Sequence, residues 1–384
     1  MRIEEIVIRK IRLPFLKEFC HSLKKGLYAD NIVVEIIAEG GGEFRGFGEG
    51  APRPYVTGES LQSVPKSIHS FLSCGHFPWE LDDPSEIWDF VDTLPPGKEH
   101  NAALCGLETA MLDLLGNEHR CSISEFFPQD FSCSEIHYGA VLPLAEIERI
   151  NDIAWLLKRI GITKIKLKMG KDFEANHRTL EEVRRVLGWG CDLKIDVNGA
   201  WDHQTAFRHL PLISEHKIKT VEQPMPPNDP NLADFAEALQ SYGIRVMADE
   251  SACELSGVVR LLRDKHYNMI NVRLSKCGGF RRSLEMIDYL REQKIPFQIA
   301  CQLGESGILS AAGRVLSLLC KDALYHDGSY DELLLGANVT ESHVSFGPKG
   351  KAGPLGGCGL GVEVNRHKLE LLSDRTDIIH FRRP

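Results

Sequence analysis

The sequence predicts an α/β protein: a (β/α)7β barrel of the TIM type with an α+β N-terminal capping domain. From about residue 136, eight short β-rich runs alternate with helical stretches. Charged residues near the ends of successive runs stand 26 to 29 residues apart, about the length of one strand plus one helix. The chain of 384 residues is too long for one ordinary hydrophobic core, so a barrel plus a smaller domain is expected.

The capping domain is predicted over residues 1–130. Residues 3–13 and 31–39 are β-like, and 102–115 predict a helix whose apolar residues recur every three or four positions, so that one face is apolar. The glycine-rich stretch 340–384 has no strong periodicity. We expect it to pack back onto the N-terminal unit and complete it.

The barrel is predicted over residues 131–339. Helices between most of the strands indicate a closed parallel barrel, and one good helix is predicted at 231–242. The eight runs are, in order, IHYGAVL, KIKLKM, LKIDVN, KTVEQP, IRVMADES, MINVRLSK, PFQIACQ and ALYHDG.

Composition and charge exclude several function classes. A net charge of −9 argues against nucleic acid as a partner, because phosphate binding needs a basic face. No apolar run reaches the roughly 18 residues that span a bilayer, so no membrane partner is expected. The 11 cysteines include no C-x-x-C pair, which fits a reducing cytoplasm and argues against structural zinc. The first ten residues have no apolar segment typical of a secretory signal.

Charges lie near the carboxyl ends of strands that should be almost wholly apolar. Their constant spacing places them in one layer at the barrel mouth, where barrel enzymes hold their chemistry. Three carboxylates flanked by lysines suit a hard divalent cation, because such ions prefer oxygen ligands. Any one charge could instead form a salt bridge inside the barrel, and Asp327 could be a turn residue. The row consists of Lys166, Lys168, Asp196, Glu222, Asp249, Lys276, Glu305 and Asp327.

The motifs carrying these charges are KIKLKMG, DVNG, VEQP, ADES and RLSKCGG, followed by CQLGESGI on the predicted seventh strand. Together with GFGEGAP near the N-terminus, they resemble the enolase superfamily and, within it, the muconate lactonizing enzyme subgroup. The resemblance extends over nearly the whole chain. It implies a barrel enzyme with a capping domain.

The resemblance also implies a role for each motif residue. Lys168 and Lys276 would be the acid/base pair on opposite faces of the substrate, and Lys166 would lower the pKa of Lys168 by like-charge repulsion. Asn198 would support the ligands of the metal. The magnesium ligands would be Asp196, Glu222 and Asp249.

The implied reaction is removal of the proton beside a carboxylate, through an enediolate. Such a proton is too weak an acid for an unaided side-chain base, and a divalent cation stabilises the charge that develops. Racemisation or epimerisation of an amino-acid or dipeptide-like substrate is the preferred interpretation. A muconate-type cycloisomerase and an o-succinylbenzoate synthase-like syn-dehydratase share the first step and are alternatives to it.

Two alternatives come from other classes. One is a Schiff-base barrel lyase that uses Lys276 or Lys168, and the other is a non-catalytic barrel that binds a ligand. A homo-oligomer is expected.

Two capping-domain loops, 15–26 and 52–59, are expected to set specificity, as loops on a scaffold usually do. His21, Tyr55 and Thr57 are their candidate substrate contacts, together with Asn198, Glu305 and Asp327 of the barrel. His21 could equally be a surface histidine, and Tyr55 could pack between the domains.

Three positions depart from the family pattern. Dipeptide epimerases of this subgroup usually carry D-x-D on the eighth strand to hold the substrate ammonium, whereas this chain has Tyr325 at the first position and Asp327 at the second. Gly304 interrupts the seventh-strand segment, and Arg273 stands where relatives often have lysine. These departures predict a different substrate rather than lost catalysis.

Overall fold

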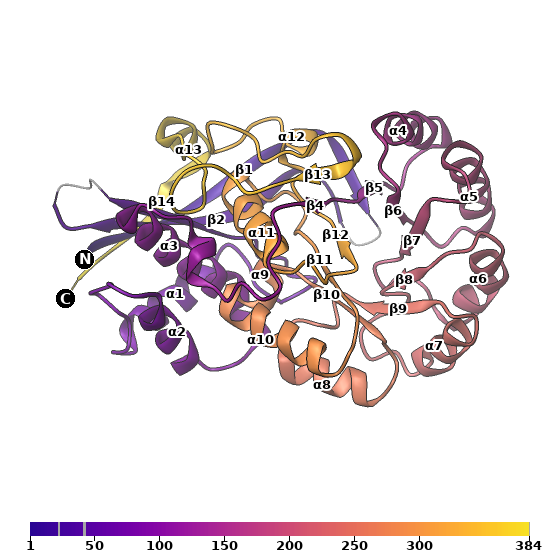
Figure 1. The fold of residues 1–384 in the computed structure, drawn as a ribbon, viewed down its shortest axis with the longest axis horizontal. Coiled ribbons are helices and arrows are strands. Elements are labelled where there is room, and N and C mark those ends of the chain that lie inside the picture. The colour runs from indigo at the N-terminus through magenta and orange to yellow at the C-terminus, as the bar shows by residue number, and fades with distance from the viewer. Residues whose placement is uncertain (22–23, 41–43, 384) are drawn as a thin grey trace.

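The computed structural model describes residues 1–21, 24–40 and 44–383, without the side chains of residues 18–21, 24 and 25. An antiparallel sheet with its helices occupies one end of the molecule and a larger parallel sheet the other (Figure 1). Within these ranges, no helix is both long and apolar enough to cross a membrane.

The parallel sheet confirms the predicted barrel. Its strand order follows chain order from β5 to β12, and the Gly139 amide donates to the His326 carbonyl at 2.8 Å, which joins the two ends of the sheet. The strands are β5 (Ala140–Leu142), β6 (Lys164–Lys168), β7 (Asp192–Asp196), β8 (Thr220–Glu222), β9 (Arg245–Ala248), β10 (Met269–Val272), β11 (Phe297–Ile299) and β12 (Tyr325–His326).

Helices follow the strands and cover the outside of the sheet, as α4 to α7 show most clearly (Figure 1). The predicted helix 231–242 is α7. The helices of this unit are α4 (Ile147–Ile160), α5 (Phe173–Leu187), α6 (His203–Glu215), α7 (Leu232–Ser241), α8 (Leu255–Arg263), α9 (Leu274–Cys277), α10 (Gly279–Glu292), α11 (Gly307–Leu318) and α12 (Asp331–Leu334).

The antiparallel sheet has the order β14-β1-β2-β3. Its edge strand β14 comes from the C-terminal part of the chain and pairs with β1. The short strand β13 pairs with β4 beside the barrel. The division into a capping domain, 1–130 with 340–384, and a barrel, 131–339, stays our proposal. The elements are β1 (Ile3–His21), β2 (Lys24–Ala38), β3 (Arg45–Gly50), β4 (Ile136–His137), β13 (Lys351–Ala352), β14 (Ser373–Arg382), α1 (Ser63–Ser73), α2 (Pro84–Thr93), α3 (Asn101–His119) and α13 (Arg366–Leu372).

The prediction of a loop at 15–26 is wrong for most of its length. β1 and β2 continue far beyond the predicted strands and pair with each other out to His21 and Lys24, with a register shift after Pro14. Their outer halves reach the barrel, because a Cβ built on Gly304 would stand 2.3 Å from Ala29 Cβ. A substitution there would strain both the contact and the glycine backbone, whose φ is +76°.

Helix α3 is buried around its whole circumference from Asn101 to Gly116, so the prediction of one apolar face is wrong. It packs against β3 on one side and against α9 and α10 of the barrel on the other. The glycines of GFGEGAP permit the close contact with β3, since a Cβ on Gly48 would stand 2.0 Å from the Gly106 carbonyl oxygen. Polar residues of α3 therefore meet protein rather than water.

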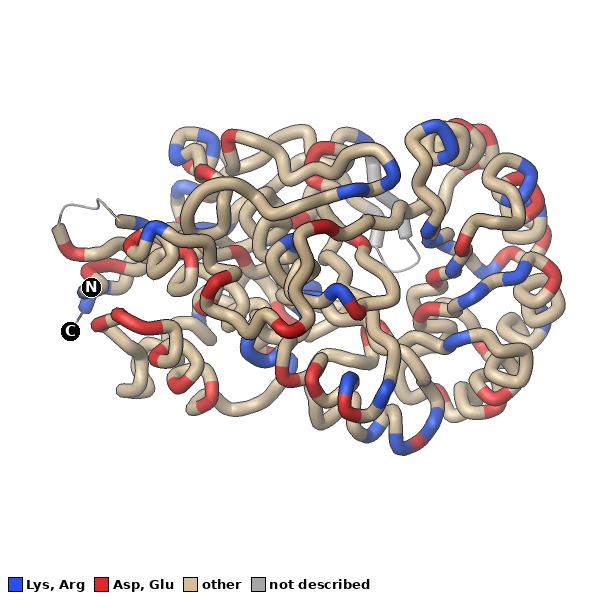
Figure 2. Tube along the Cα trace, viewed as in Figure 1, with Lys and Arg blue, Asp and Glu red and all other residues tan. Residues whose placement is uncertain are grey.

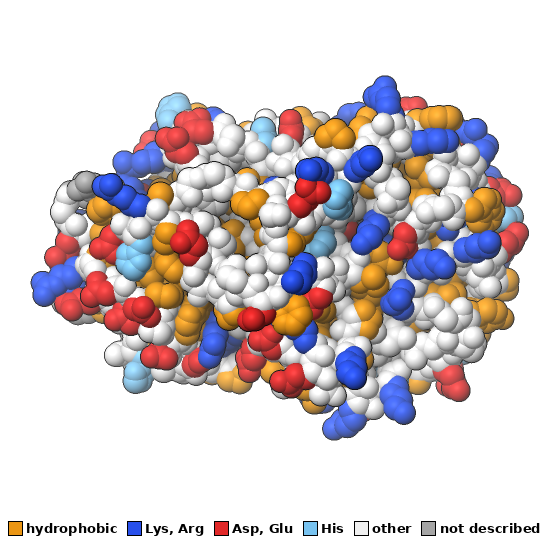
Figure 3. All heavy atoms as spheres, in the orientation of Figure 1, with side chains coloured by type: hydrophobic (Ala, Val, Ile, Leu, Met, Phe, Trp, Pro, Cys, Tyr) orange, Lys and Arg blue, Asp and Glu red, His pale blue; other side chains and the backbone are white. Residues whose placement is uncertain are grey.

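Charges of both signs occur on the inner strands of the barrel as well as on its outer helices (Figure 2). On the molecular face drawn in Figure 3, acidic and basic side chains are interspersed.

Candidate active site

Three buried carboxylates lie side by side at the carboxyl ends of adjacent strands. Asp196 ends β7 and pairs in register with Glu222, which ends β8, and Asp249 directly follows β9. All three are at most 1% exposed. The strand-end positions place them in the layer that the regular spacing of the sequence predicts.

Two cations bridge neighbouring carboxylates. Lys166 Nζ lies 3.8 Å from Asp196 Oδ2 and 3.3 Å from Glu222 Oε2. A guanidinium nitrogen of Arg273 lies 3.6 Å from Glu222 Oε1 and also forms an ion pair with Asp249. Each carboxylate therefore shares a cation with the next one along the row.

The two predicted acid/base lysines stand at opposite ends of this row. Lys168 Nζ donates to Asp196 Oδ2 at 2.6 Å and to Asn198 Oδ1 at 2.8 Å. Lys276 Nζ lies 3.1 Å from Asp249 Oδ1 and donates to the Asn271 carbonyl at 2.6 Å. Since β6 and β10 are four strands apart in an eight-stranded ring, the lysines approach the centre from opposite sides.

The sequence spacing places Lys276 at the end of the sixth strand, and this position is wrong. β10 ends at Val272, and Lys276 belongs to the short helix α9 that follows. The charge directly after the strand is Arg273. From this one turn of helix, the side chain of Lys276 still reaches Asp249.

The protonation of these groups follows from burial and their partners. Burial opposes ionisation of Asp249, but Arg273 and Lys276 outweigh it and lower its pKa to about 2. Burial likewise opposes charge on Lys276, yet Asp249 raises the pKa of this lysine above its ordinary value. Burial and the neighbouring Asp196 raise the pKa of Glu222. Any ligand that neutralises Asp249 would make Lys276 easier to deprotonate.

The donor set fits a hard divalent cation. It consists of carboxylate oxygens, and the buried Glu222 Oε2 accepts no hydrogen bond, although Lys166 Nζ lies 3.3 Å from it. Among the described residues, no three acidic, histidine or cysteine side chains are already gathered as a metal-binding group. Nitrogen atoms of Lys166, Lys168 and Arg273 lie against the oxygens instead. Convergence of the three carboxylates on magnesium therefore stays a prediction.

The other substrate-contact candidates have different positions. Tyr55 borders a cavity of about 10 Å³ with Phe15, Tyr28 and Leu303. Burial raises the pKa of its hydroxyl, although the charges of Arg53 and Arg273 act against this. Thr57 belongs to a turn, where its hydroxyl accepts from the Glu59 amide at 3.5 Å. The side chain of His21 lies outside the described residues.

Glu305 and Asp327 are buried at the mouth. Glu305 lies six residues beyond the end of β11 and accepts a hydrogen bond from the Gln302 amide, and burial raises its pKa to about 8. Asp327 follows β12 and lies between Lys166 and Lys194. The hydroxyl of Tyr325, in contrast, donates to Asp192 at the opposite end of the barrel.

Sequence reasoning assigned no site role to Asn271 and Glu250, whose hydrogen bonds help to hold this arrangement. Asn271 Nδ2 donates to Glu222 Oε1 at 2.9 Å, and Asn198 Nδ2 donates to Glu250 Oε1 at 3.0 Å. Arg273 was seen only as a departure from the family. The available signal was the alternation of polar and apolar residues within buried strands, as in MINVR.

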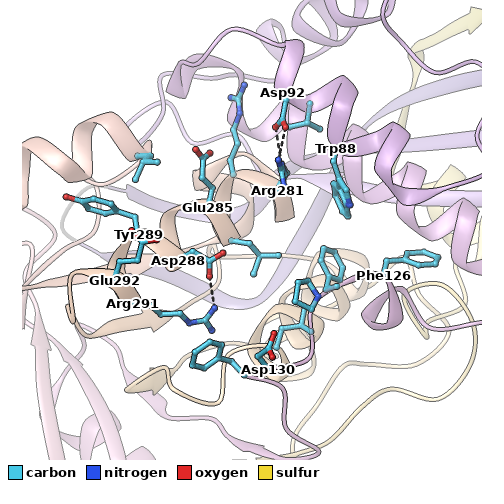
Figure 4. A pocket seen from close by; sticks show the side chains of 18 of the residues that line it. Trp88, Asp92, Phe126, Asp130, Arg281, Glu285, Asp288, Tyr289, Arg291 and Glu292 are labelled. Atoms are coloured by element: carbon cyan, nitrogen blue, oxygen red, sulfur yellow. Dashed lines mark hydrogen bonds and ion pairs between the residues drawn. The ribbon is translucent and has the colours of Figure 1, made fainter.

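One groove of the molecule lies away from the barrel mouth. It measures about 950 Å³ and is bordered by residues of α2 and α10 and by the segment around Phe126 (Figure 4). Its labelled arginines already have acidic partners, Arg281 with Asp92 and Arg291 with Asp288. None of the candidate catalytic residues lines it, so the barrel mouth is the candidate active site.

Comparison with known proteins identifies the family and supports the fold. The family described as enolase C-terminal domain-like matches residues 150–368, more than half of the chain. The hydrophobic dipeptide epimerase of Enterococcus faecalis is 25% identical over 318 residues, covering 81% of this chain and 86% of that protein. The structure of the N-succinyl Arg/Lys racemase from Bacillus cereus has a TM-score of 0.85 at 22% identity and covers all of both chains. The dipeptide epimerase from Cytophaga hutchinsonii, solved with Mg and D-Ala-L-Val, has a TM-score of 0.83 at 23% identity, covering 99% of this chain and 100% of that one. The chain belongs to the enolase C-terminal domain-like family.

Proposed function

We propose that this protein is a magnesium-dependent racemase or epimerase that removes and returns the α-proton of a carboxylate substrate derived from an amino acid. The observation that carries the proposal is the placement of Lys168 and Lys276 at opposite ends of the carboxylate row. Inversion of a carbon centre needs one proton donor and one acceptor on opposite faces. The E. faecalis and B. cereus relatives act on dipeptides and N-succinyl amino acids, and the C. hutchinsonii structure contains Mg.

Each residue has a defined task in this proposal. One lysine accepts the α-proton while the other donates a proton to the opposite face. Asn198 orients Lys168 through its 2.8 Å hydrogen bond. Magnesium, when bound by Asp196, Glu222 and Asp249, would stabilise the negative charge that develops on the substrate carboxylate.

Proton exchange in heavy water tests the proposal. The protein is incubated with N-acyl amino acids, dipeptides and acid sugars, and deuterium at the α-carbon is measured by mass spectrometry and NMR. We expect magnesium-dependent exchange with at least one amino-acid derivative, lost with EDTA and restored by added magnesium. Exchange that survives EDTA, or exchange only of acid sugars, contradicts the proposal.

A further inference from the structure

The two proposed base lysines are held by different parts of the fold. Lys168 ends β6, a strand that pairs with β5 on one side and β7 on the other, and its ammonium donates to Asp196 and Asn198 at the end of β7. Lys276 lies instead on α9, a buried helix of only four residues, Leu274–Cys277. A single helical turn has little stability of its own, so the position of Lys276 depends on the segments packed around it.

Helix α3 provides a contact at Lys276 itself. Asn101, the first residue of α3, is 1% exposed, and its Nδ2 donates to the main-chain carbonyl of Lys276 at 2.6 Å. The same nitrogen donates to the carbonyl of Cys253 at 2.8 Å. Cys253 follows closely after Asp249, the carboxylate that pairs with the Lys276 ammonium. One side-chain amide therefore connects the segment that carries Lys276 with the segment that carries its acidic partner.

The orientation of the Asn101 amide is fixed by its surroundings. Its Oδ1 lies beside Gly278, where an added Cβ would stand 2.8 Å away, and accepts from Arg282 Nη1 at 3.5 Å. The opposite orientation would turn this oxygen towards two carbonyl oxygens, which cannot donate. Glu59 holds the start of α3, because both of its carboxylate oxygens accept from the Ala102 amide at 2.9 Å.

Two further hydrogen bonds hold the chain on either side of Lys276. The amide of Ala51, which directly follows β3, donates to Ser275 Oγ at 2.8 Å. Glu108 of α3 accepts from the Arg281 amide in the first turn of α10 at 2.9 Å. Residues of the proposed capping domain therefore contact α9 and the start of α10, before and after the lysine.

We propose that Asn101 is a positioning residue for Lys276, so that helix α3 sets the place of one of the two bases and not of the other. The inference rests on the proposed proton exchange and concerns only the face of the α-carbon that Lys276 serves. A base acts only within hydrogen-bond reach of the proton that it removes. A displacement of about 1 Å can slow a reaction by about a hundredfold, so a small shift of α9 impairs Lys276 without removing it.

Exchange into each recovered enantiomer tests the inference. Asn101→Asp keeps the shape of the side chain but replaces the donor with an oxygen, which would repel the carbonyls of Lys276 and Cys253. Each enantiomer of a substrate that the wild type exchanges is incubated separately with magnesium in heavy water. Deuterium in the recovered starting enantiomer then reports removal and return of the proton on one face. Lys276→Ala identifies the enantiomer that Lys276 serves.

We expect Asn101→Asp to slow exchange of that enantiomer by about tenfold or more, through kcat rather than KM. Exchange of the other enantiomer should stay within about twofold of the wild-type rate, since Lys168 keeps its own partners. Asn101→Ala removes the donor without adding a charge and should change the ratio of the two rates in the same direction. This ratio does not depend on how much of a variant is folded, so a partly folded preparation suffices.

Asp113→Ala is the matched control. Asp113 is a buried acid of the same helix, but it accepts from the amides of Phe47 and Leu360, away from α9. Its loss should leave the ratio of the two rates within about twofold of the wild-type ratio. Equal slowing of both enantiomers by the Asn101 variants, an unchanged ratio, or selective loss of the other enantiomer overturns the inference and leaves the proposed function standing. Absence of exchange by the wild type with every substrate overturns both.

Discussion

Buried carboxylates of the capping region and of the barrel mouth differ in their partners. Four of the capping region accept hydrogen bonds mainly from main-chain amides, whereas four of the mouth are paired with lysine and arginine side chains. Glu35 of the capping region is an exception, because it pairs with Arg9 and Arg45. The first group comprises Glu49, Glu59, Glu108 and Asp113. The second group comprises Asp196, Glu222, Asp249 and Asp327.

The difference separates these four acids of the capping region from the acids that we propose to be functional. Main-chain donors are fixed by the fold, so Glu49, which accepts from Ser306 and Leu309 at 3.0 Å, ties β3 to the start of α11. Side-chain cations can rotate away and leave their carboxylates to another ligand. The pKa values differ accordingly. Burial raises the pKa of Glu108 to about 7, whereas cationic partners overcome burial and lower the pKa of Asp327 to about 2.

The largest expected effect is on the mouth lysines. Replacing Lys276 with alanine should slow α-proton exchange of one enantiomer by about 10²- to 10⁴-fold, while the other enantiomer still exchanges. Lys168→Ala should slow exchange of that other enantiomer instead. The reason is that each lysine serves one face of the α-carbon. Exchange of separate enantiomers in heavy water measures this, with Lys66→Ala on the exposed side of α1 as control.

Other outcomes would change the interpretation. If only one lysine variant loses turnover and the other keeps most activity, the protein is a single-base enzyme such as a cycloisomerase or dehydratase. If both variants exchange both enantiomers, neither lysine is the base.

The capping acids should affect stability first. Glu49→Ala leaves the amides of Ser306 and Leu309 and the side-chain amide of Asn31 without their acceptor. Each unsatisfied buried donor costs about 1–3 kcal/mol, so the free energy of unfolding should fall by about 3 kcal/mol or more. Denaturant titration measures the loss, and Glu237→Ala on the exposed side of α7 should stay within about 0.5 kcal/mol. A cost for Glu49→Ala as small as the control's would mean that water replaces the carboxylate.

The same comparison explains what sequence reasoning could reach. Charges at the ends of buried parallel strands are conspicuous, because nothing polar is expected there, and the positions of Asp196, Glu222 and Asp249 follow from strand spacing alone. Lys276 was placed wrongly because a turn of helix intervenes after β10 and spacing cannot distinguish it from strand.

Residues of the capping region gave weaker signals. Glu108 and Asp113 stand five positions apart on α3, which is not the spacing of three or four that marks one helical face. Each accepts from a distant main-chain amide, that of Arg281 for Glu108 and that of Leu360 for Asp113, more than 170 residues away in sequence. Contacts of that kind depend on tertiary packing, and no local pattern encodes them. The outer halves of β1 and β2 were likewise missed, because their pairing depends on register rather than on apolar alternation.

The last expected effect concerns the pH dependence of stability, and over a single pH unit it is smaller than the loss expected for Glu49→Ala. Burial raises the pKa of Asp113 from 3.8 to about 7, although the amides of Phe47 and Leu360 act against it. Between these values the unfolded chain has released a proton that the folded chain keeps. The contribution of Asp113 is therefore complete below pH 3.8, falls by about 1.4 kcal/mol per pH unit, and is lost once the pH passes about 7.

Asp113→Asn should remove this slope, so the difference in unfolding free energy between wild type and variant should shrink as the pH rises from 4 to about 7. Denaturant titrations across that range measure it, and the effects of other buried acids cancel because both proteins contain them.

Asp327→Asn should change the pH dependence of the unfolding free energy in the opposite direction. The lowered pKa of Asp327 stabilises the wild type above pH 3.8, and that contribution is lost as the pH falls towards 2. Slopes of the same sign for the two variants would mean that the partners of the carboxylates, main chain or side chain, do not set their ionisation.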